Sequence, residues 1–471
     1  MEMLTCHLDK TCATPLYEQL YSYIKKEIIT GRLPFGEKLP SKRTIVNLMK
    51  VSQNTVETAY DQLIAEGYVE SIARKGYYIL AKEDLAYVDQ TIPEEREETE
   101  GYAWDYQFHP GKVDTAHFPF SKWRKYAKQV IDEDNQSLLL LGDMQGEYSL
   151  RKQIAKYLYQ ARGITCIPDD IIIGAGTEML LQQLVLLFGN QTTYGVEDPG
   201  YHAISHILKQ YPNKVSPLRV DENGLNVKQL ENTAIDLVYV TPSHHFPYGS
   251  VLSVNRRVKL LNWAQSNSTR YIIEDDYDSE FRYSGKPIPS LESMDKSNKV
   301  IYLGSFSKSL IPSLRISYMV LPPTLTHQYK RKFSFYQCAV SRMSQNILAA
   351  FMASGDFGKH LNRMRTVYRR KRDITLKVLK PYQDIRIIGE QSGLHVVLEV
   401  NNGMAESELV QHASNNNIEI YPLSRYALGE KKQNPPQMVL GFAGIPEDEL
   451  EVAIKKLLES WEEGKGSVIE R

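Results

Sequence analysis

An acid-rich stretch near residue 90 is the feature that most constrains how this 471-residue chain can fold. Residues 82–103 contain the run TIPEEREETEG, which is rich in glutamate and poor in apolar side chains. Such a stretch cannot bury enough surface to offset its loss of chain entropy, so we expect a linker there. We therefore predict separate folding units: residues 1–81, the linker 82–103, a large domain over 104–330 and a smaller C-terminal subdomain over 331–471.

Residues 14–80 have the pattern of three helices followed by a β-hairpin. Thr14 and Pro15 predict the start of the first helix, and Ser41 and Ser52 predict the caps of the next two. Hairpin strands are predicted at 68–72 and 77–80, around a turn at 73–76. The side chains expected to face inward are Leu16, Leu20, Ile24, Ile28, Ile45, Leu48, Met49, Val56, Ala59, Tyr60, Leu63 and Ile64. This order of elements is typical of a winged helix-turn-helix, a mainly α DNA-binding domain.

The helix that follows Ser52 is the expected recognition helix of this domain. Its first turn carries the residues predicted to reach base edges in the major groove, which are Gln53, Asn54 and Thr55. The basic residues predicted to contact phosphates or the minor groove are Lys42, Arg43, Lys50, Arg74 and Lys75. The alternative for each is a solvated surface charge. The chain's net charge of −1 gives no global signal for nucleic acid, so the DNA contacts depend on where these residues lie.

From residue 104 onward, short apolar runs alternate with helical stretches. The runs predicted as strands are 170–173, 192–196, 237–240, 271–273, 300–302 and 316–320. Buried strands separated by helices are typical of an α/β domain with a largely parallel sheet. Residues 331–471 open with a long helical stretch and then carry strand-like runs at 393–400 and 438–442, which predict an α+β subdomain.

The strongest chemical signal is the sequence GSFSK at residues 304–308, directly after a predicted strand. Lys308 is suited to form an imine with an aldehyde cofactor, because a desolvated lysine favours its neutral, nucleophilic form. Ser305 and Ser307 can reach phosphate oxygens, and Arg315 can add a bidentate charge. The alternative is an ordinary surface lysine in a loop.

A second signal is the run of acids that ends the predicted strand 271–273. Acids at the end of a buried strand are costly unless they bind something. Asp275 can pair with the ring nitrogen of pyridoxal phosphate, which keeps that ring protonated and electron-withdrawing. Tyr277 can hydrogen-bond the ring hydroxyl. A polar loop and a Mg²⁺ site are the alternatives.

A third signal is the strand, glycine-rich turn and helix start at residues 170–187. Gly176 and Thr177 lie where backbone N–H groups can approach a phosphate, although a purely structural turn is the alternative. Tyr201 is a candidate to stack on the cofactor ring, and residues 242–247 can line the same pocket. These motifs all fall at the carboxyl ends of strands, where open α/β sheets bind ligands. His244 and His245 have no evident metal partners, and we expect no metal site.

Several motifs together make the chain recognisable. PLYEQLYSYIKKEIITGRLPFGEKLPSKR and SQNTVETAYDQLIAEGY resemble the winged helix of the GntR superfamily. YGVEDPGY, TPSHHFPYG, YIIEDDYDSEF and GSFSKSLIPSLRISYMVLPP resemble the motifs of fold-type I aminotransferases. The combination is similar to the MocR/GabR-type regulators, which fuse these two domains, and the resemblance covers nearly the whole chain.

The resemblance implies a role for each candidate residue. Lys308 would be the Schiff-base lysine, Asp275 the ring-nitrogen partner and Tyr277 a ring-hydroxyl partner. The phosphate site would be formed by Ser305, Ser307, Arg315, Gly176 and Thr177, with Tyr201 beside the ring. The family also implies a head-to-tail homodimer that binds double-stranded DNA with paired half-sites or direct repeats.

Two departures from the family pattern bear on the effector. Aminotransferases of this fold hold the substrate carboxylate with an arginine near Gly-Phe-Ala, where this chain has Val439 and Gly444. Members that sense 4-aminobutyrate carry a further arginine where this chain has His202 and Ala203. The usual asparagine before Pro-Thr-Gly is also replaced, by Phe246. Arg425 is a cation that remains available in this part of the chain.

These departures favour a transcription regulator that senses pyridoxal phosphate, alone or with an amino compound, as do members that control vitamin B6 synthesis. We expect at most a residual aminotransferase half-reaction. The alternatives are a working aminotransferase with a DNA-binding appendage and a 4-aminobutyrate-responsive activator. The four cysteines have no metal-like spacing, and the N-terminus has no signal-peptide pattern. No run is long and apolar enough to cross a membrane, so we expect a cytoplasmic protein.

Overall fold

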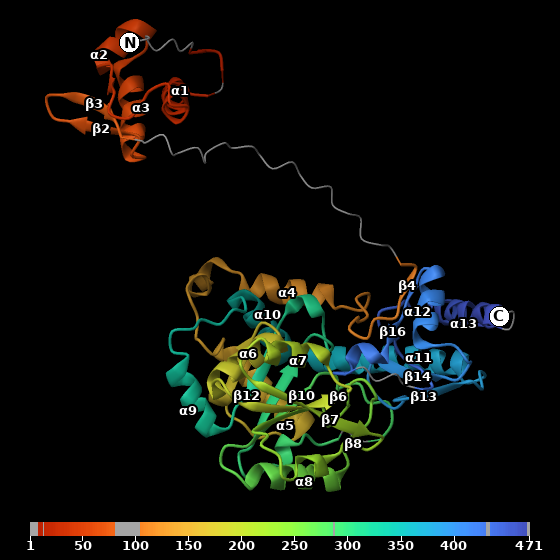
Figure 1. Ribbon diagram of the computed structural model, residues 1–471. Helices are drawn as coiled ribbons and strands as arrows, with labels where there is room; N and C mark the ends of the chain where they lie inside the picture. The colour runs from red at the N-terminus through yellow and green to blue at the C-terminus, as the bar shows by residue number, and fades with distance from the viewer. Residues whose placement is uncertain (1–7, 13, 81–103, 286–287, 430–433, 469–471) are drawn as a thin grey trace. The chain divides into compact units, whose positions relative to one another are not determined.

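The computed structural model describes residues 8–12, 14–80, 104–285, 288–429 and 434–468. It divides into two compact units, Met1–Glu100 and Gly101–Arg471, which we treat separately (Figure 1). The linker predicted at 82–103 lies outside the described residues.

The N-terminal unit is a winged helix-turn-helix, as predicted. Its helices are α1 (Leu16–Ile29), α2 (Lys42–Met49) and α3 (Gln53–Ala65), and the strands β2 (Val69–Ile72) and β3 (Gly76–Ile79) form the hairpin. A short strand that the sequence did not reveal, β1 (Lys38–Leu39), pairs with β3. Ser41 and Ser52 cap α2 and α3 as expected, because their hydroxyls accept from the amides of Thr44 and Thr55.

Two local expectations for this unit were wrong. The helix α1 begins at Leu16 and not at Pro15, and no side chain caps it. Leu48 is 44% exposed and does not join the core, in which Ile45 is the fully buried residue of α2. The core of the unit otherwise consists of apolar positions on all three helices, including Leu20, Ile24 and Val56.

The second unit is built on an eight-stranded sheet of order β5-β12-β11-β10-β9-β6-β7-β8. The strands are β5 (Ile171–Gly174), β6 (Thr193–Asp198), β7 (Lys214–Asp221), β8 (Gly224–Leu225), β9 (Leu237–Val240), β10 (Tyr271–Asp276), β11 (Val300–Ser305) and β12 (Ser317–Val320). The pairs among β7, β6, β9, β10 and β11 are parallel, while β12 is antiparallel to both of its neighbours. The sequence predicted six of these strands and missed β7 and β8.

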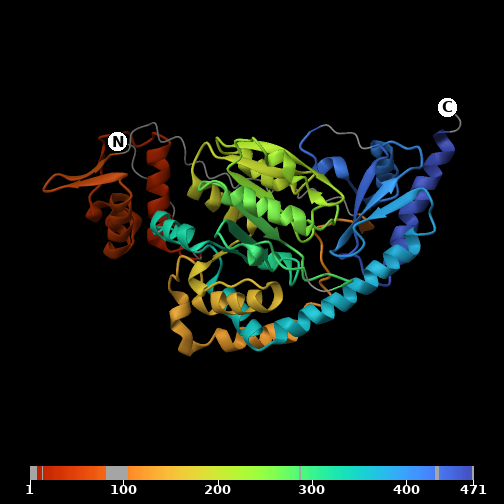
Figure 2. The ribbon, with the colours of Figure 1, turned by 90° about the horizontal axis from the view of Figure 1, so that it is seen from below.

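Helices cover both faces of this sheet (Figures 1 and 2). One face packs on α6 (Thr177–Phe188), α7 (His202–Lys209) and α9 (Pro323–Lys332). The other face packs on α5 (Tyr148–Arg162) and α8 (Val254–Gln265). Neighbouring strand residues alternate between the two cores, since Ile172 lies in one and Ile171 and Ile173 lie in the other. Every residue of the central strand β9 is therefore buried.

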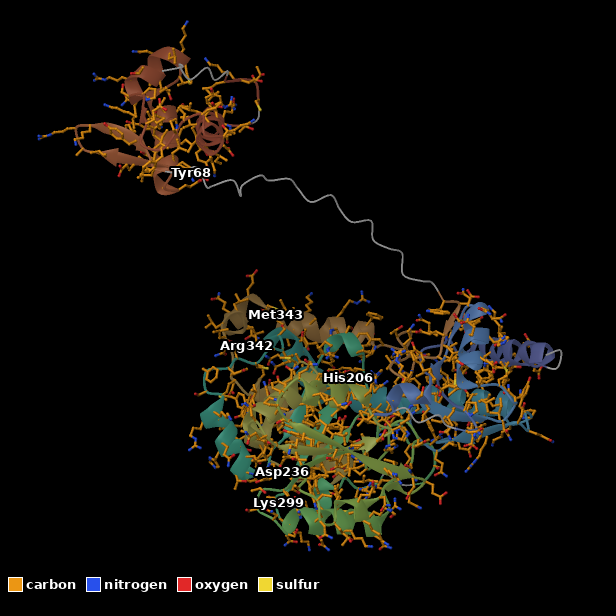
Figure 3. The ribbon with its side chains drawn as sticks, viewed as in Figure 1. Tyr68, His206, Asp236, Lys299, Arg342 and Met343 are labelled. Atoms are coloured by element: carbon orange, nitrogen blue, oxygen red, sulfur yellow. The ribbon has the colours of Figure 1, made fainter. Side chains whose placement is uncertain are left out.

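Two further helices connect the sheet to the C-terminal part of the chain. α10 (Arg342–Ala353) and the start of α11 (Asp356–Leu379) pack with α4 (Phe120–Val130) and α5 on the large core. Arg342, at the start of α10, pairs with Glu147 just before α5 at 2.7 Å (Figure 3). The division expected at residue 331 falls inside α9.

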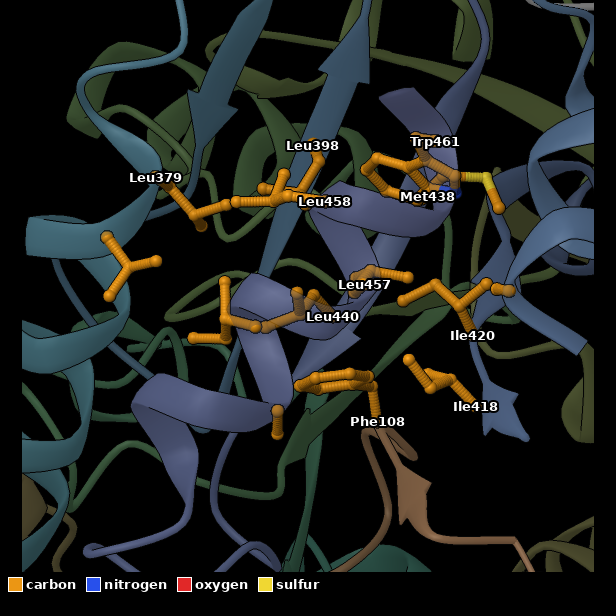
Figure 4. Packing of buried hydrophobic residues seen from close by; sticks show 14 of the residues in the cluster. Phe108, Leu379, Leu398, Ile418, Ile420, Met438, Leu440, Leu457, Leu458 and Trp461 are labelled. Atoms are coloured by element: carbon orange, nitrogen blue, oxygen red, sulfur yellow. The ribbon is translucent and has the colours of Figure 1, made fainter. Parts of the chain in front are cut away.

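The C-terminal subdomain has an antiparallel sheet of order β13-β14-β17-β16. Its strands are β13 (Ile385–Ile388), β14 (His395–Val400), β16 (Tyr421–Pro422) and β17 (Gln437–Gly441), and its helices are α12 (Glu406–Asn415) and α13 (Leu450–Val468). A separate pair joins β15 (Ile418–Glu419) to β4 (Tyr106–Gln107), so the chain following residue 104 enters this subdomain first. Figure 4 shows its core, a cluster that includes Phe108, Leu440, Leu457 and Trp461.

No helix among the described residues has the length and apolar character needed to cross a membrane.

Candidate functional site

The candidate site forms where β10 and β11 end side by side. These strands are parallel and in register, with Asp275 opposite Leu303 and Asp276 opposite Gly304. The acids that end β10 and the GSFSK loop that follows β11 are therefore held at the same edge of the sheet.

A cavity of about 450 Å³ lies at this edge. The predicted cofactor residues that line it are Thr177, Tyr201, Asp275, Tyr277, Ser305, Ser307, Lys308 and Arg315. Gly176, the remaining predicted residue, precedes α6 with a φ of 106°, and a Cβ there would collide with the Arg315 guanidinium. Residues that are far apart in the sequence thus meet in one cavity of a size suited to a small cofactor.

Lys308 lies in the wall of this cavity. Its Nζ donates a hydrogen bond of 2.6 Å to the carbonyl oxygen of Pro110. Burial lowers the pKa of the Lys308 amine to about 8, a shift that the negative charge of Asp278 opposes. A large fraction of neutral amine is therefore present near pH 8, as attack on an aldehyde requires.

Asp275 is buried, and its two carboxylate oxygens differ. Oδ2 accepts a hydrogen bond from the Tyr239 hydroxyl, whereas Oδ1 is buried without a hydrogen-bond partner among the described residues. Burial raises the pKa of the Asp275 carboxyl to about 7. A buried, unsatisfied carboxylate oxygen in a cavity is costly, and a protonated pyridine nitrogen would satisfy it.

Tyr277 belongs to a buried polar chain beside Asp275. Its hydroxyl lies 3.0 Å from Nδ1 of His244, and the same Nδ1 lies 2.8 Å from Oδ1 of Asp278. Burial raises the pKa of Tyr277 well above its usual value, so the phenol stays protonated and can donate. Among the described residues, Nε2 of His244 and Oδ2 of Asp278 have no hydrogen-bond partners. The hydrogen bonds among Tyr277, His244 and Asp278 can therefore rearrange when a ligand binds.

The predicted phosphate residues in the cavity wall include two that contact each other, Ser305 and Ser307. The Ser305 hydroxyl lies 3.0 Å from that of Ser307 and 3.1 Å from that of Ser317. Arg315 donates to Glu178 in the first turn of α6 at 2.9 Å. Hydroxyls, a guanidinium and a helix N-terminus together suit a phosphate. The Glu178 carboxylate already binds the Arg315 guanidinium at this site.

The mouth of the cavity is aromatic. Tyr201 is 38% exposed, and its ring lies 6.1 Å from that of Phe246, which in turn lies 4.9 Å from Tyr426. The Tyr201 hydroxyl donates to Glu178 at 3.3 Å. Arg425 also lines the cavity and lies over the ring of Tyr421. Aromatic rings and the Arg425 guanidinium therefore border this part of the cavity.

The predicted DNA-contacting residues lie mostly on the surface of the N-terminal unit. Arg43, Lys50, Gln53, Asn54, Arg74 and Lys75 are exposed, and Thr55 is half-buried with its hydroxyl on Ser52. Arg74 and Lys75 form the tip of the hairpin, as expected for a wing. Lys42 differs, because its Nζ lies 3.6 Å from Glu57 and 3.7 Å from Asp61 of α3. Its charge is already partnered within the unit.

Several residues of the site were missed by sequence reasoning. His109 and Pro110 reach it from the loop and turn that follow β4, and Tyr421 and Tyr426 reach it from the C-terminal subdomain. Glu178 was overlooked although it directly follows the predicted Thr177. Tyr239 lies in the predicted strand 237–240, but its contact with Asp275 depends on the pairing of β9 with β10, which the sequence did not predict.

Two family models match the chain in separate segments. Residues 16–79 match the family described as bacterial regulatory proteins, gntR family. Residues 111–457 match the aminotransferase class I and II family. The two segments correspond to the winged unit and to the unit that holds the cavity.

The full-length relatives are transcription regulators. The uncharacterized HTH-type transcriptional regulator YdeL of Bacillus subtilis is 44% identical over 464 residues, covering 97% of this chain and 99% of that protein. The probable rhizopine catabolism regulatory protein MocR of Rhizobium meliloti is 32% identical over 480 residues, covering 96% and 94%. The HTH-type pyridoxine biosynthesis transcriptional regulator PdxR of Corynebacterium glutamicum is 30% identical over 438 residues, covering 93% and 94%.

Solved aminotransferases share the fold of the larger unit. The kynurenine aminotransferase of Pyrococcus horikoshii superposes with a TM-score of 0.68 at 25% identity, over 76% of this chain and 90% of that one. The fold is that of class I aminotransferases, which typically bind pyridoxal phosphate. The chain therefore belongs to the MocR-type helix-turn-helix transcription regulators, in which a GntR-family DNA-binding domain is fused to an aminotransferase class I domain.

Proposed function

We propose that this regulator binds pyridoxal phosphate in the cavity at the ends of β10 and β11 and changes its DNA binding in response. The observation that carries the proposal is the pairing, in one cavity, of a lysine with a lowered pKa and a buried acid with an unsatisfied oxygen. When bound, pyridoxal phosphate supplies an aldehyde that condenses with an amine and a protonated ring that withdraws electrons.

The residues present fit this cofactor. Lys308 would hold the aldehyde carbon, Oδ1 of Asp275 would accept from the ring nitrogen, and Tyr277 would donate to the ring hydroxyl. The hydroxyls of Ser305, Ser307 and Ser317, with Arg315 and the start of α6, would hold the phosphate. Tyr201 would cover one face of the ring. Each of these roles uses a group that the structure leaves accessible from the cavity.

Sensing is favoured over turnover because the family's usual carboxylate-binding arginines are replaced in this chain. The two positions where a carboxylate-binding arginine is expected hold Val439, which is fully buried in the subdomain sheet, and Gly444. His202 and Ala203 take the place of the other arginine expected in sensors of 4-aminobutyrate. A relative that is 30% identical is named as a pyridoxine biosynthesis regulator, which supports genes of vitamin B6 or amino-acid metabolism as targets. We also propose a homodimer on paired DNA sites.

The test is a titration of the purified full chain with pyridoxal phosphate, read out by binding to the DNA upstream of its own gene. We expect the cofactor to change the DNA affinity and Lys308→Ala to abolish both the covalent attachment and the response. Lys299→Ala is the matched control, because Lys299 precedes β11 at its opposite end and donates to backbone carbonyls of Asn267 and Ser268 (Figure 3).

Three outcomes distinguish the candidate functions. DNA binding that follows the cofactor alone supports the sensor. Rapid turnover of an amino acid against a keto acid would instead indicate a working aminotransferase. A response to 4-aminobutyrate with the cofactor, and none to the cofactor alone, would indicate a 4-aminobutyrate-responsive activator.

A further inference from the structure

The cations that line the cavity differ in whether the protein already partners them. Arg315 donates to Glu178 at 2.9 Å, and Lys308 donates to the Pro110 carbonyl at 2.6 Å. The Arg425 side chain, in contrast, makes no hydrogen bond or ion pair within the described part of the chain, and its guanidinium lies 5.3 Å from the ring centroid of Tyr421. Arg425 is thus a cavity-lining guanidinium with its donors free for an incoming anion.

The segment that carries Arg425 is fixed at both ends. The Ser424 hydroxyl donates to Glu406 of α12, in the C-terminal subdomain. The Tyr426 carbonyl accepts from the amide of Gly200 at 3.0 Å, and the Leu428 amide donates to Asp198 at 3.0 Å. The short 3-10 helix Leu423–Tyr426 therefore joins the C-terminal subdomain to the end of β6, next to Tyr201. A ligand held by Arg425 would act on this junction.

The electrostatic surroundings of Arg425 favour an anion. Burial and the charges of Lys308 and Arg425 lower the pKa of His109, and burial, His206 and Arg425 lower that of His202. Both imidazoles line the cavity and stay neutral near pH 7. Glu419 acts electrostatically on Tyr421 and Tyr426, yet no ion pair links it to Arg425 within the residues described.

The family's usual arginine positions are closed in this chain. Val439 pairs with Val397 and Tyr421 inside the subdomain sheet, where a charged side chain has no room. A Cβ at Gly444 would lie 2.6 Å from the Cβ of Lys112, so a longer side chain there would displace Lys112. A carboxylate that enters the cavity therefore finds its guanidinium on a different element, the 3-10 helix Leu423–Tyr426.

We propose that Arg425 is the anion-binding end of a second subsite, which takes the carboxylate of a small effector lying beside the cofactor. The effector is a short amino carboxylate whose apolar spacer lies against Tyr421, Tyr426 and Phe246 at the cavity mouth. This inference rests on the proposed function, since cofactor and effector share one cavity.

The experiment separates the carboxylate contact from the chemistry of the cofactor. The full chain is loaded with pyridoxal phosphate and treated with borohydride, so that the cofactor stays attached to Lys308 and cannot exchange with an amine. Intact mass and peptide mapping establish the attachment. Ligand-detected NMR then measures the affinity for propanoate, with propylamine as the probe that lacks the carboxylate. The same titrations are made on Arg425→Gln, Arg425→Lys and Arg386→Gln, the last being an arginine of β13 outside the cavity.

We expect propanoate to bind the wild-type protein at least about 10-fold more tightly than it binds Arg425→Gln, because the variant cannot form a charge-assisted hydrogen bond to the carboxylate. Arg425→Lys should retain part of the affinity, and Arg386→Gln all of it, with propylamine binding unchanged throughout. Equal propanoate affinity in wild type and Arg425→Gln would overturn the inference while leaving the proposed function intact. Failure of borohydride to attach the cofactor at Lys308 would overturn both.

Discussion

At the scale of single residues, the chemistry of the site depends on burial more than on charge pairing. Lys308 and Asp275 are both shifted toward their neutral forms, to pKa values of about 8 and about 7, and desolvation is the main cause in each case. Binding of a protonated ring beside Asp275 would restore that carboxylate's charge, so cofactor binding and ionisation are linked.

The lowered pKa of Lys308 predicts the pH dependence of cofactor attachment. Only the neutral amine attacks the aldehyde, so the rate should rise about tenfold per pH unit below pH 8 and level off above it. Stopped-flow absorbance of the full chain mixed with pyridoxal phosphate measures the profile. Asp278→Asn should shift the midpoint to lower pH, because Asp278 raises the amine's pKa, whereas the cofactor's own ionisations are the same in both proteins. A midpoint near the ordinary lysine value of 10.5 would refute the assignment.

The ion pair between Glu178 and Arg315 predicts that the site binds phosphate more weakly than its hydroxyl and guanidinium donors alone would. Its carboxylate holds Arg315 at 2.9 Å, and a bound phosphate must share that arginine with a like charge. Glu178→Gln should therefore tighten binding of pyridoxal phosphate, and of inorganic phosphate as a competitor, by about 3- to 10-fold. Equilibrium dialysis measures both. Glu147→Gln is the control, since it removes an arginine pair outside the cavity. Weaker phosphate binding in Glu178→Gln would show that Glu178 positions Arg315.

At the scale of elements, what could be predicted depended on whether a residue's neighbours in space were also its neighbours in sequence. The motifs at the ends of β5, β10 and β11 were found because each strand carries its own functional side chains. The pocket that they share follows from the rule for open α/β sheets. His109 and Tyr421 could not be placed, because their route into the cavity runs through the pairing of β15 with β4, which no local pattern encodes.

The strands that were missed have a physical reason. β7 carries Lys214, Ser216 and Pro217, a composition that predicts a loop. It is a strand because β6 provides a parallel partner along six residue pairs, which outweighs its poor local propensity. β1 has two residues and depends wholly on its pairing with β3. Leu48 was misplaced for a similar reason, since α2 is too short to bury more than one position fully.

The recognition helix offers a prediction at this scale. The Ser52 hydroxyl caps α3 by accepting from the Thr55 amide at 3.2 Å, so Ser52→Ala should destabilise the first turn of α3 by about 1 kcal/mol. Hydrogen exchange of the α3 amides should then be about fivefold faster, and DNA affinity should fall because Gln53 and Asn54 lie in that turn. Ser52→Thr keeps the acceptor and is the control. Unchanged exchange in Ser52→Ala would mean that packing of Val56 and Tyr60 alone fixes the turn.

At the scale of the whole molecule, the chain must convert events in one unit into DNA binding by the other. Residues 1–81 carry nearly balanced charge, with ten Lys and Arg against nine Asp and Glu, so their DNA affinity depends on a few unpartnered cations and, in the proposed homodimer, on two copies acting together. Within the described residues Arg43 on α2 has no ion pair, while its neighbour Lys42 is shared between Glu57 and Asp61. Adjacent positions on one helix therefore differ in how much charge they can offer to a phosphate.

This difference predicts unequal effects on salt dependence. Arg43→Ala should lower the slope of log affinity against log salt by about 1 for each phosphate that the arginine no longer neutralises, hence by about 2 for two copies on paired half-sites. Lys42→Ala should lower it by less than half as much, because removing Lys42 also frees Glu57 and Asp61 and takes away a charge that was already neutralised. Fluorescence anisotropy of a labelled duplex across a range of salt concentrations, with the cofactor at saturation, measures both slopes. Equal slopes for the two variants would mean that DNA displaces the acids of α3 from Lys42. In that case both residues contact phosphates, and the DNA affinity is lowered by the need to separate Lys42 from Glu57 and Asp61. Glu57→Gln should then bind DNA more tightly than the wild type in the same titration.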